Sequence, residues 1–422
     1  MATALMPKQN LSTPQILWIS LYIIWGLDAF LLIGAVVGAH VHRGAMQAIG
    51  KDSAPSIIAA QSIKTSLADM DADVANELLG AKDGDYDYQR KKAATALIEA
   101  AKNITYGDAE QKPIEAIQVN LGIYEAKVQY ARDLWEWGDA GYVDAYRAAA
   151  HVMDADLLPQ ADNLDRANND QLQATYKSQS GESIASLVFL LVMAAALVGA
   201  LVAIQAYLNR KMRRILNPML ALATVLALGF VLYTVGILAA ERSDLKVAKE
   251  DAFDSIHALW QAKAVAYAAN TDESRYLLDT KHAGEHGLRF IEKANLLKSG
   301  YLATELSNIT FEGEKEAANR AVESWDKYLE IDRQIRSLET QGKHTAAIAL
   351  CIGNDPGQSN WAFNEFDRAI DTTLKINQDQ FDASVREGFS TLSNFEIKAG
   401  IVTLIIALLS FFGLLQRIQE YR

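Results

Sequence analysis

Four long apolar stretches alternate with polar sequence along the chain, and two of the polar regions between them are large. Each stretch approaches or exceeds the roughly 20 residues that a helix needs to cross about 30 Å of hydrocarbon. The first stretch is longer than the apolar core of a signal peptide, which favours an uncleaved anchor. The pattern therefore predicts an integral membrane protein. Its four expected transmembrane helices are residues 16–41, 184–208, 218–240 and 398–415.

The connector between the second and third spans, residues 209–217, is strongly basic and contains no Asp or Glu. Short loops rich in Lys and Arg tend to face the cytoplasm. We therefore expect the connector to be cytoplasmic and to contact a cytoplasmic partner. With an even number of spans, residues 1–15 and 416–422 fall on the same side, in the cytoplasmic (inner) membrane of a bacterium. The four cations of the connector are Arg210, Lys211, Arg213 and Arg214.

The two large polar regions, residues 42–183 and 241–397, are then predicted to lie outside the cytoplasm. The first contains 14 Lys and Arg against 23 Asp and Glu, and the second 18 against 27, so each has a formal net charge of −9. The net charge of −12 for the whole chain thus combines acidic outer regions with basic cytoplasmic ends. A nucleic-acid-binding surface needs clustered Lys and Arg, so we exclude nucleic acid as a partner.

Both polar regions are predicted to be helical, and the expected fold class is an all-α membrane protein with two antiparallel four-helix bundles outside the membrane. The chain has only seven Pro, lacks the alternating Val, Ile and Thr of strands, and is rich in Ala, Leu, Glu, Lys and Gln. Short loops between long helices are typical of such bundles. The single cysteine, Cys351, cannot form a disulfide within the chain. The predicted turns are residues 80–87, 107–113, 138–141, 283–287, 312–313 and 353–357.

The two halves of the chain resemble each other. At an offset of 199 residues, residues 43–79 align with residues 242–278 without a gap, and nine of the 37 pairs are identical. The same offset superposes the preceding spans, so we expect two tandem copies of one unit in the same orientation. The identical pairs are Arg43/Arg242, Asp52/Asp251, Ser56/Ser255, Ile57/Ile256, Ala59/Ala258, Lys64/Lys263, Asp73/Asp272, Leu78/Leu277 and Leu79/Leu278.

One pentad, from His282 to His286, has the H-x-x-E-H pattern of a class of zinc peptidases. A zinc site of this kind needs both His side chains on one rigid helix. Gly284 and Gly287 are expected to break that helix, and the pentad falls in a predicted turn. We therefore expect a solvated loop here and no zinc.

Asp83, Asp85 and Asp87 resemble the beginning of a calcium-binding loop. The loop would need Gly at its sixth position and Glu at its twelfth, where this chain has Tyr88 and Ala94. Calcium is therefore not expected from this linear motif. No phosphate-binding loop, G-x-S-x-G or dinucleotide turn occurs either, so we predict no cofactor, no metal and no catalytic residue, and the protein is not expected to be an enzyme.

Asp28, Gly34 and Gly38 of the first span are predicted to form contacts between transmembrane helices. An ionised carboxylate at this depth costs at least ~2.5 kcal/mol, so such groups usually have a function or a buried partner. A protonated Asp28 that hydrogen-bonds across helices is favoured over a proton relay, because one carboxylate makes a poor relay. The glycines form a small-residue seam. The hydrogen-bond partners considered are Tyr233, Thr234 and Ser410.

Aromatic residues are frequent in the outer regions, and most are expected in the bundle cores. Trp361 and Phe363 follow the predicted turn at residues 353–357. Exposed aromatic residues often mark binding surfaces, so these two form a candidate recognition patch.

Two helical outer regions bracketed by spans resemble the sensing domains of bacterial chemoreceptors, but no cytoplasmic coiled coil follows the last span. The chain is more similar to the GlnX-like family of four-span bacterial membrane signalling proteins. This resemblance covers nearly the whole topology and rests locally on residues 142–147 (YVDAYR), 156–159 (DLLP), 252–262 (AFDSIHALWQA) and 272–278 (DESRYLL).

The resemblance implies a non-enzymatic relay that detects a solute-loaded periplasmic binding protein outside and informs a kinase or regulator inside. A self-assembling membrane scaffold is the alternative, with Asp28 and the glycine seam in its contacts, and it would form a large homo-oligomer in membrane lipid. A transporter is less favoured because the spans have few polar residues besides Asp28.

Overall fold

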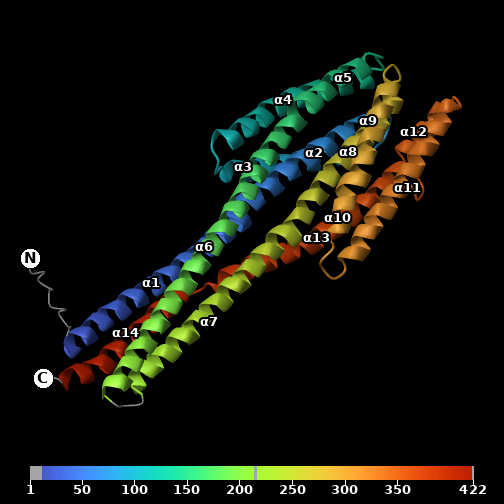
Figure 1. Cartoon of the computed structure of the whole chain (residues 1–422). Coiled ribbons are helices and arrows are strands. Elements are labelled where there is room, and N and C mark those ends of the chain that lie inside the picture. The colour runs from blue at the N-terminus through green and yellow to red at the C-terminus, as the bar shows by residue number, and fades with distance from the viewer. Residues whose placement is uncertain (1–11, 213–215, 421–422) are drawn as a thin grey trace, which may run out of the picture. The chain divides into compact units, whose positions relative to one another are not determined.

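The computed structural model describes residues 12–212 and 216–420. These residues form α-helices joined by short turns, without a β-strand among them, which confirms the prediction of an all-helical protein (Figure 1). The chain divides into two compact units, and each unit combines segments that are far apart in the sequence. The apolar unit comprises residues 1–46, 176–245 and 386–422, and the polar unit comprises residues 47–175 and 246–385.

The apolar unit contains four helices that are long and apolar enough to cross a membrane, which agrees with the four spans expected from the sequence. One side of each helix packs in a common core that includes Leu21, Leu197, Ala227 and Ile406. The other side leaves large apolar residues exposed, as expected of helices that face lipid. The four helices are α1 (Thr13–Gln47), the second part of α6 (Leu158–Met212), α7 (Pro218–Lys246) and α14 (Phe395–Gln419).

Polar contacts tie this unit together at both ends. Asn217 precedes α7, and its side-chain oxygen accepts a hydrogen bond from the Met219 backbone N–H, as an N-cap residue does. The Asn217 amide also donates to the Gly413 carbonyl at 2.7 Å, which links α7 to α14. At the opposite end, Arg43 of α1 forms an ion pair of 2.6 Å with Glu396 of α14.

The polar unit is built around α2 (Ala54–Leu78) and α8 (Asp254–Leu278), which pack against each other and are buried along most of their length. Leu278 of α8 lies in the core of the first half, among residues of α2 and α4. The two polar regions therefore form one compact unit and not two independent ones. The remaining helices are α3 (Tyr86–Lys102), α4 (Asp108–Glu136), α5 (Tyr142–Val152), α9 (Ala283–Leu296), α10 (Ala303–Ser307), α11 (Glu314–Thr340), α12 (His344–Cys351) and α13 (Ser359–Thr391).

Four π-helical segments interrupt the long helices of this unit. Two of them, η1 (Ala48–Ser53) and η3 (Val247–Phe253), precede α2 and α8. The other two, η2 (Met153–Leu157) and η4 (Leu297–Leu302), follow α5 and α9. Such segments are rare in helices and often occur where a helix must adapt to function.

The same side-chain contacts recur in both halves of the polar unit. The Asn103 amide donates to the Asp52 carbonyl and to Ser56 Oγ. At the positions that correspond to Asp52 and Ser56 at the 199-residue offset, the second half receives the same hydrogen bonds from Asn308. Glu110 and Glu314 each accept hydrogen bonds from two consecutive backbone N–H groups before a helix.

Two of the predicted turns are helical. Residues 283–287, expected to form a turn, are the beginning of α9. The turn expected at residues 107–113 ends at Gly107, and Pro113 lies in the second turn of α4. Gly287 does not break α9, because its missing side chain makes room for a neighbour. A Cβ atom there would lie 2.9 Å from the guanidinium of Arg336. The packing of α11 on α9 therefore outweighs the low helix propensity of glycine.

Candidate functional site

The contact between α2 and α8 buries an unusual number of charged and polar side chains. Arg275 of α8 is only 2 % exposed. Its guanidinium forms ion pairs with Asp71 of α2 at 2.5 Å and with Asp154 of η2 at 2.8 Å. Arg275 therefore joins the second half of the unit to two elements of the first half.

Two tyrosines complete this arrangement. The hydroxyls of Tyr124 and Tyr146 donate to Asp71 Oδ1 at 3.1 and 3.2 Å, and Arg275 Nε donates to the Tyr146 hydroxyl at 3.2 Å. Burial alone would lower the pKa of Arg275, but the negative charge of Asp71 and its other acidic neighbours hold it well above its usual range. We call Arg275, Asp71, Asp154, Tyr124 and Tyr146 the arginine network. Apart from Asp154, which is partly exposed, its members are buried, and each is hydrogen-bonded within the network or ion-paired. Such a contact has a strong geometric preference.

A second ion pair joins the halves beside this network. Arg147 of α5 donates to both carboxylate oxygens of Asp279, which follows α8, at 2.7 and 2.9 Å. Burial would raise the pKa of Asp279, but the hydrogen bonds from Arg147 and His282 lower it to about 2. The carboxylate is therefore ionised at physiological pH, and the bidentate pair persists.

The H-x-x-E-H pentad lies at this place, and both of its histidines approach Asp279. His282 Nδ1 contacts Asp279 at 3.2 Å, and Glu285 pairs with Arg289 of its own helix. His286 is buried and lies 3.7 Å from both Asp272 and Asp279. The histidines thus contribute to the acidic and basic contacts around the arginine network.

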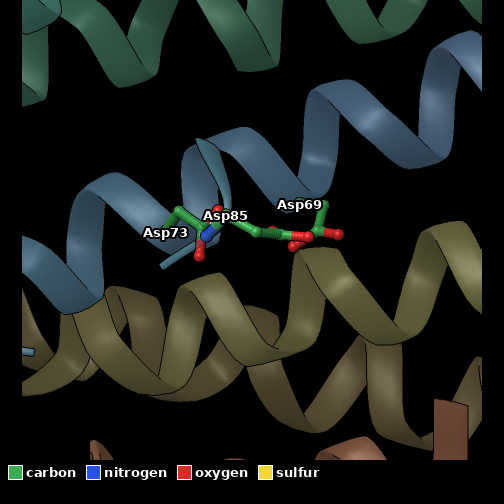
Figure 2. A group of neighbouring side chains, drawn as sticks. All are labelled: Asp69, Asp73 and Asp85. Atoms are coloured by element: carbon green, nitrogen blue, oxygen red, sulfur yellow. Dashed lines mark hydrogen bonds between the residues drawn. The ribbon is translucent and has the colours of Figure 1, made fainter. Parts of the chain in front are cut away.

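Three carboxylates gather at the same stretch of α2. Asp69 and Asp73 belong to α2, and Asp85 lies in the turn before α3. One oxygen of each carboxylate lies within 4.8 Å of the others (Figure 2). Asp73 Oδ2 accepts a hydrogen bond from the Asp85 backbone N–H, and Asp85 Oδ2 accepts one from Gln89. We call Asp69, Asp73 and Asp85 the acidic triad.

A further buried acid lies on the other side of α8. Glu273 is fully buried, and Ser359 donates to its Oε2 at 2.7 Å. The thiol of Cys351 contacts the same oxygen at 3.7 Å. Burial, together with the nearby charge of Asp332, raises the pKa of Glu273 to about 8.

In the apolar unit, the predicted contact residues lie between helices. A Cβ at Gly34 would lie 2.9 Å from the ring of Phe189 on α6, and one at Gly38 would lie 3.2 Å from Leu238 on α7. Asp28 is buried at 4 % exposure, and its Oδ1 has no hydrogen-bond partner in the part of the chain that the structure describes. Among the described residues, no hydrogen bond joins Asp28 to Thr234 or Ser410, and both hydroxyls donate to carbonyls of their own helices.

The other predicted site residues are placed as follows. Arg210 and Lys211 are exposed at the end of α6, whereas Arg213 and Arg214 lie outside the described residues. Trp361 is half-buried. Phe363 lies in the aromatic core against Tyr267, at a ring distance of 4.9 Å, and is 4 % exposed. Its burial removes it from the candidate recognition patch.

The arginine network and the acidic triad are not among the sites predicted from the sequence. A local signal for them exists, because Asp69, Asp71 and Asp73 interrupt an otherwise small or apolar stretch of α2. Acids within such a stretch are buried with the helix and need partners. The cationic partner of Asp71, Arg275, lies 204 residues away and could not be identified from sequence spacing.

Residues 45–177 match the family of the actinobacterial sensor domain. The match covers the first polar region, which lies between the first two candidate spans, and it supports a bacterial sensor protein. Neither the comparison with curated proteins nor the comparison with solved structures gave a match.

Proposed function

We propose that this protein is a non-enzymatic transmembrane sensor that relays an extracytoplasmic signal to a cytoplasmic partner. One observation carries the proposal: the sensor-domain match at residues 45–177 is bracketed by two of the candidate spans. A sensor domain placed in this way has one route to the opposite side of the membrane, through the spans themselves. The signal is a solute or a solute-loaded binding protein, and the receiving partner is a kinase or another regulator.

Helix continuity supports such a relay. Helical structure runs without a break over residues 13–78, 142–211 and 218–278, so each stretch includes a candidate span and helices of the polar unit. A shift or rotation of α2 relative to α8 is therefore transmitted along covalently continuous helices. The segments η1 and η3 lie where the two units meet in the sequence and provide adaptable turns there.

The arginine network is the element that we expect to have two states. A ligand shifts a conformational equilibrium only by its differential affinity for the two states. Packed, charged contacts have discrete arrangements, so rearrangement of Arg275 between Asp71 and Asp154 would change the α2–α8 contact in one step.

We further infer that the two halves arose by tandem duplication. The recurring contacts of Asn103 and Asn308, and of Glu110 and Glu314, support this inference, as do the matched helices α2 and α8. The match to the sensor-domain family falls in the first half only, so the second half has diverged further from that family.

Cysteine labelling in intact cells tests the topology that the relay requires. In a Cys351→Ser background, Lys343→Cys places a thiol on an exposed turn of the polar unit, and Asn209→Cys places one at the basic connector. A membrane-impermeant maleimide should label position 343 in intact cells and position 209 only after permeabilisation. Labelling of position 209 in intact cells, with position 343 protected, would refute the outside-in direction.

The relay itself is tested with the same connector cysteine. The full chain, with a fluorophore at position 209, is placed in lipid nanodiscs and exposed to amino acids with and without a fraction of soluble extracytoplasmic proteins. We expect a change in fluorescence that is lost in the Arg275→Met variant and retained in Arg333→Met, an exposed control. An equal response in all three proteins would contradict transmission through the arginine network.

A further inference from the structure

We propose that Asp69, Asp73 and Asp85 bind one divalent cation, Ca²⁺ in preference to Mg²⁺ and Zn²⁺. This inference is independent of the proposed sensor function. It also departs from the expectation drawn from the linear D-x-D-x-D pattern, since only Asp85 of that pattern belongs to the triad and the other two carboxylates come from α2.

The geometry of the triad fits a single ion. Ca²⁺ binds oxygen at 2.3–2.6 Å, so two oxygens on the same ion can lie no more than about 5 Å apart. The three ligand oxygens lie within 4.8 Å of one another. Asp69 and Asp73 are one helical turn apart on the same face of α2, and Asp85 approaches them from the following turn, as Figure 2 shows. Gly84 permits that approach, because a Cβ there would lie 3.1 Å from Asp73 Oδ1.

Asp69 is a buried carboxylate without a cationic or hydrogen-bonding partner among the described residues. It is only 8 % exposed, yet its carboxylate accepts no hydrogen bond and has no Lys, Arg or His within ion-pair distance in the described ranges. Lys263, whose charge lowers the pKa of Asp69, is already engaged by Asp367 at 3.0 Å and Asp371 at 2.6 Å. A buried carboxylate in this position is costly unless a positive charge neutralises it.

The charges that face the triad are mostly negative. Burial, followed by the charges of Asp73, Asp85 and Asp367, raises the pKa of Asp69 well above its usual range. Burial and Asp85 raise the pKa of Asp73 to about 8, with a smaller contribution from Glu77. Negative charges thus outnumber the cations around the triad.

In the second half, a lysine neutralises the carboxylate at the corresponding position of α8. The residues 199 positions after Asp69 and Asp73 are Ala268 and Asp272. The ammonium of Lys293 donates to the Asp272 carboxylate at 2.5 Å and to the Ala268 carbonyl at 3.2 Å. The first half has an additional carboxylate in place of alanine and no ion-paired side chain at this point. A metal ion would occupy the place that the lysine ammonium takes in the second half.

The ligand set selects the ion. Three carboxylates and no His or Cys favour hard cations over Zn²⁺. A helix and a turn supply an irregular set of oxygens, which Ca²⁺ accepts more readily than Mg²⁺, since Mg²⁺ demands near-ideal octahedral geometry. Asp85 is exposed, so the ion has access from solvent, and water completes its coordination.

Calorimetric titration and thermal unfolding of the full chain test the site. The purified protein is stripped with EDTA in detergent and titrated with Ca²⁺, Mg²⁺ and Zn²⁺. We expect Ca²⁺ to bind most tightly, near one equivalent, and to raise the Tm. Asp69→Asn and Asp73→Asn should each weaken Ca²⁺ binding at least about tenfold. The matched controls Asp83→Asn and Asp87→Asn, from the same segment, should bind like the unmodified protein.

Loss of folding is separated from loss of the site by measurement in EDTA. Asp69→Asn removes an unpaired buried charge, so without metal this variant should be at least as stable as the unmodified protein. The site is refuted if Ca²⁺ leaves the Tm of the unmodified protein unchanged, or if the control variants lose as much affinity as Asp69→Asn. Equal or tighter binding of Mg²⁺ or Zn²⁺ would overturn the assignment to Ca²⁺. These outcomes do not depend on the connector labelling that tests the sensor proposal.

Discussion

Replacement of Arg275 by Met should destabilise the polar unit far more than replacement of an arginine at its surface. The substitution removes the guanidinium that neutralises Asp71, which is itself 2 % exposed. Removing one partner of a buried ion pair typically costs about 3–5 kcal/mol, because the other charge remains buried without compensation. Asp71 keeps the hydrogen bonds from Tyr124 and Tyr146, and Asp154 is partly solvated, so the cost should fall near the lower end, at about 3 kcal/mol.

The assay is thermal unfolding of the full chain in detergent, followed by tryptophan fluorescence, to which the buried Trp325 contributes. For a unit of this size, each kcal/mol lowers the Tm by about 2–4 °C, so a decrease of about 6–12 °C is expected. Arg333→Met is the control. Arg333 pairs with Glu330 within one exposed helical turn, and such pairs contribute at most about 1 kcal/mol.

A double substitution separates the ion pair from general damage to packing. Asp71→Asn together with Arg275→Met removes both charges and keeps an acceptor for the two tyrosines. Replacing both members of a buried pair is often nearly neutral, so the double variant should recover at least half of the stability lost in Arg275→Met. If the two single losses simply add, or if Arg275→Met is no worse than Arg333→Met, the reasoning about the buried charge is wrong.

Two further predictions concern buried groups in each unit. The pKa of Glu273 is raised to about 8 in the folded protein from about 4.5 in the unfolded chain, so its contribution to stability is complete below pH 4.5 and is lost as the pH rises to 8. The Tm of Glu273→Gln should therefore depend less on pH than that of the unmodified protein between pH 5 and 8, and a curve parallel to that of the exposed control Glu323→Gln would contradict this. In the apolar unit, Gly34→Val should reduce stability by about 1–3 kcal/mol, because the added carbons overlap Phe189. A Cβ added at Gly26 on the same helix meets no neighbouring atom within 4 Å, so Gly26→Val should be close to neutral. Equal melting curves for the two variants would argue against the contact with Phe189.

Local sequence patterns were sufficient to predict the helical class and the four apolar helices. Long apolar runs such as the one around Leu21 and Leu31 admit few alternatives, since only a helix satisfies its own backbone in lipid. Local rules were less reliable at glycines. Gly287 was expected to end a helix, but contact with Arg336 holds it within α9. The tertiary contact outweighs a propensity difference of only about 1 kcal/mol.

The candidate sites were harder to predict for a related reason. Phe363 is an aromatic residue of the kind that often marks a binding surface. Exposure depends on packing, however, and the structure places its ring in the core. Asp85 was considered as part of a linear calcium motif, which was rejected because Tyr88 and Ala94 stand where Gly and Glu are required, yet its neighbours in space are Asp69 and Asp73. Whether carboxylates converge depends on how the turn after α2 folds back.

The order of polar and apolar residues by itself determined that this chain is helical, that four of its helices are apolar enough to cross a membrane, and that its polar regions are acidic. These properties follow from local chemistry, because hydrophobicity, helix propensity and charge belong to each segment alone. Only the tertiary structure decided that α2 and α8 pack together and that Arg275 neutralises Asp71, 204 residues away. Such pairings arise from the burial of complementary surfaces, and no short-range pattern encodes which distant residue completes a buried charge.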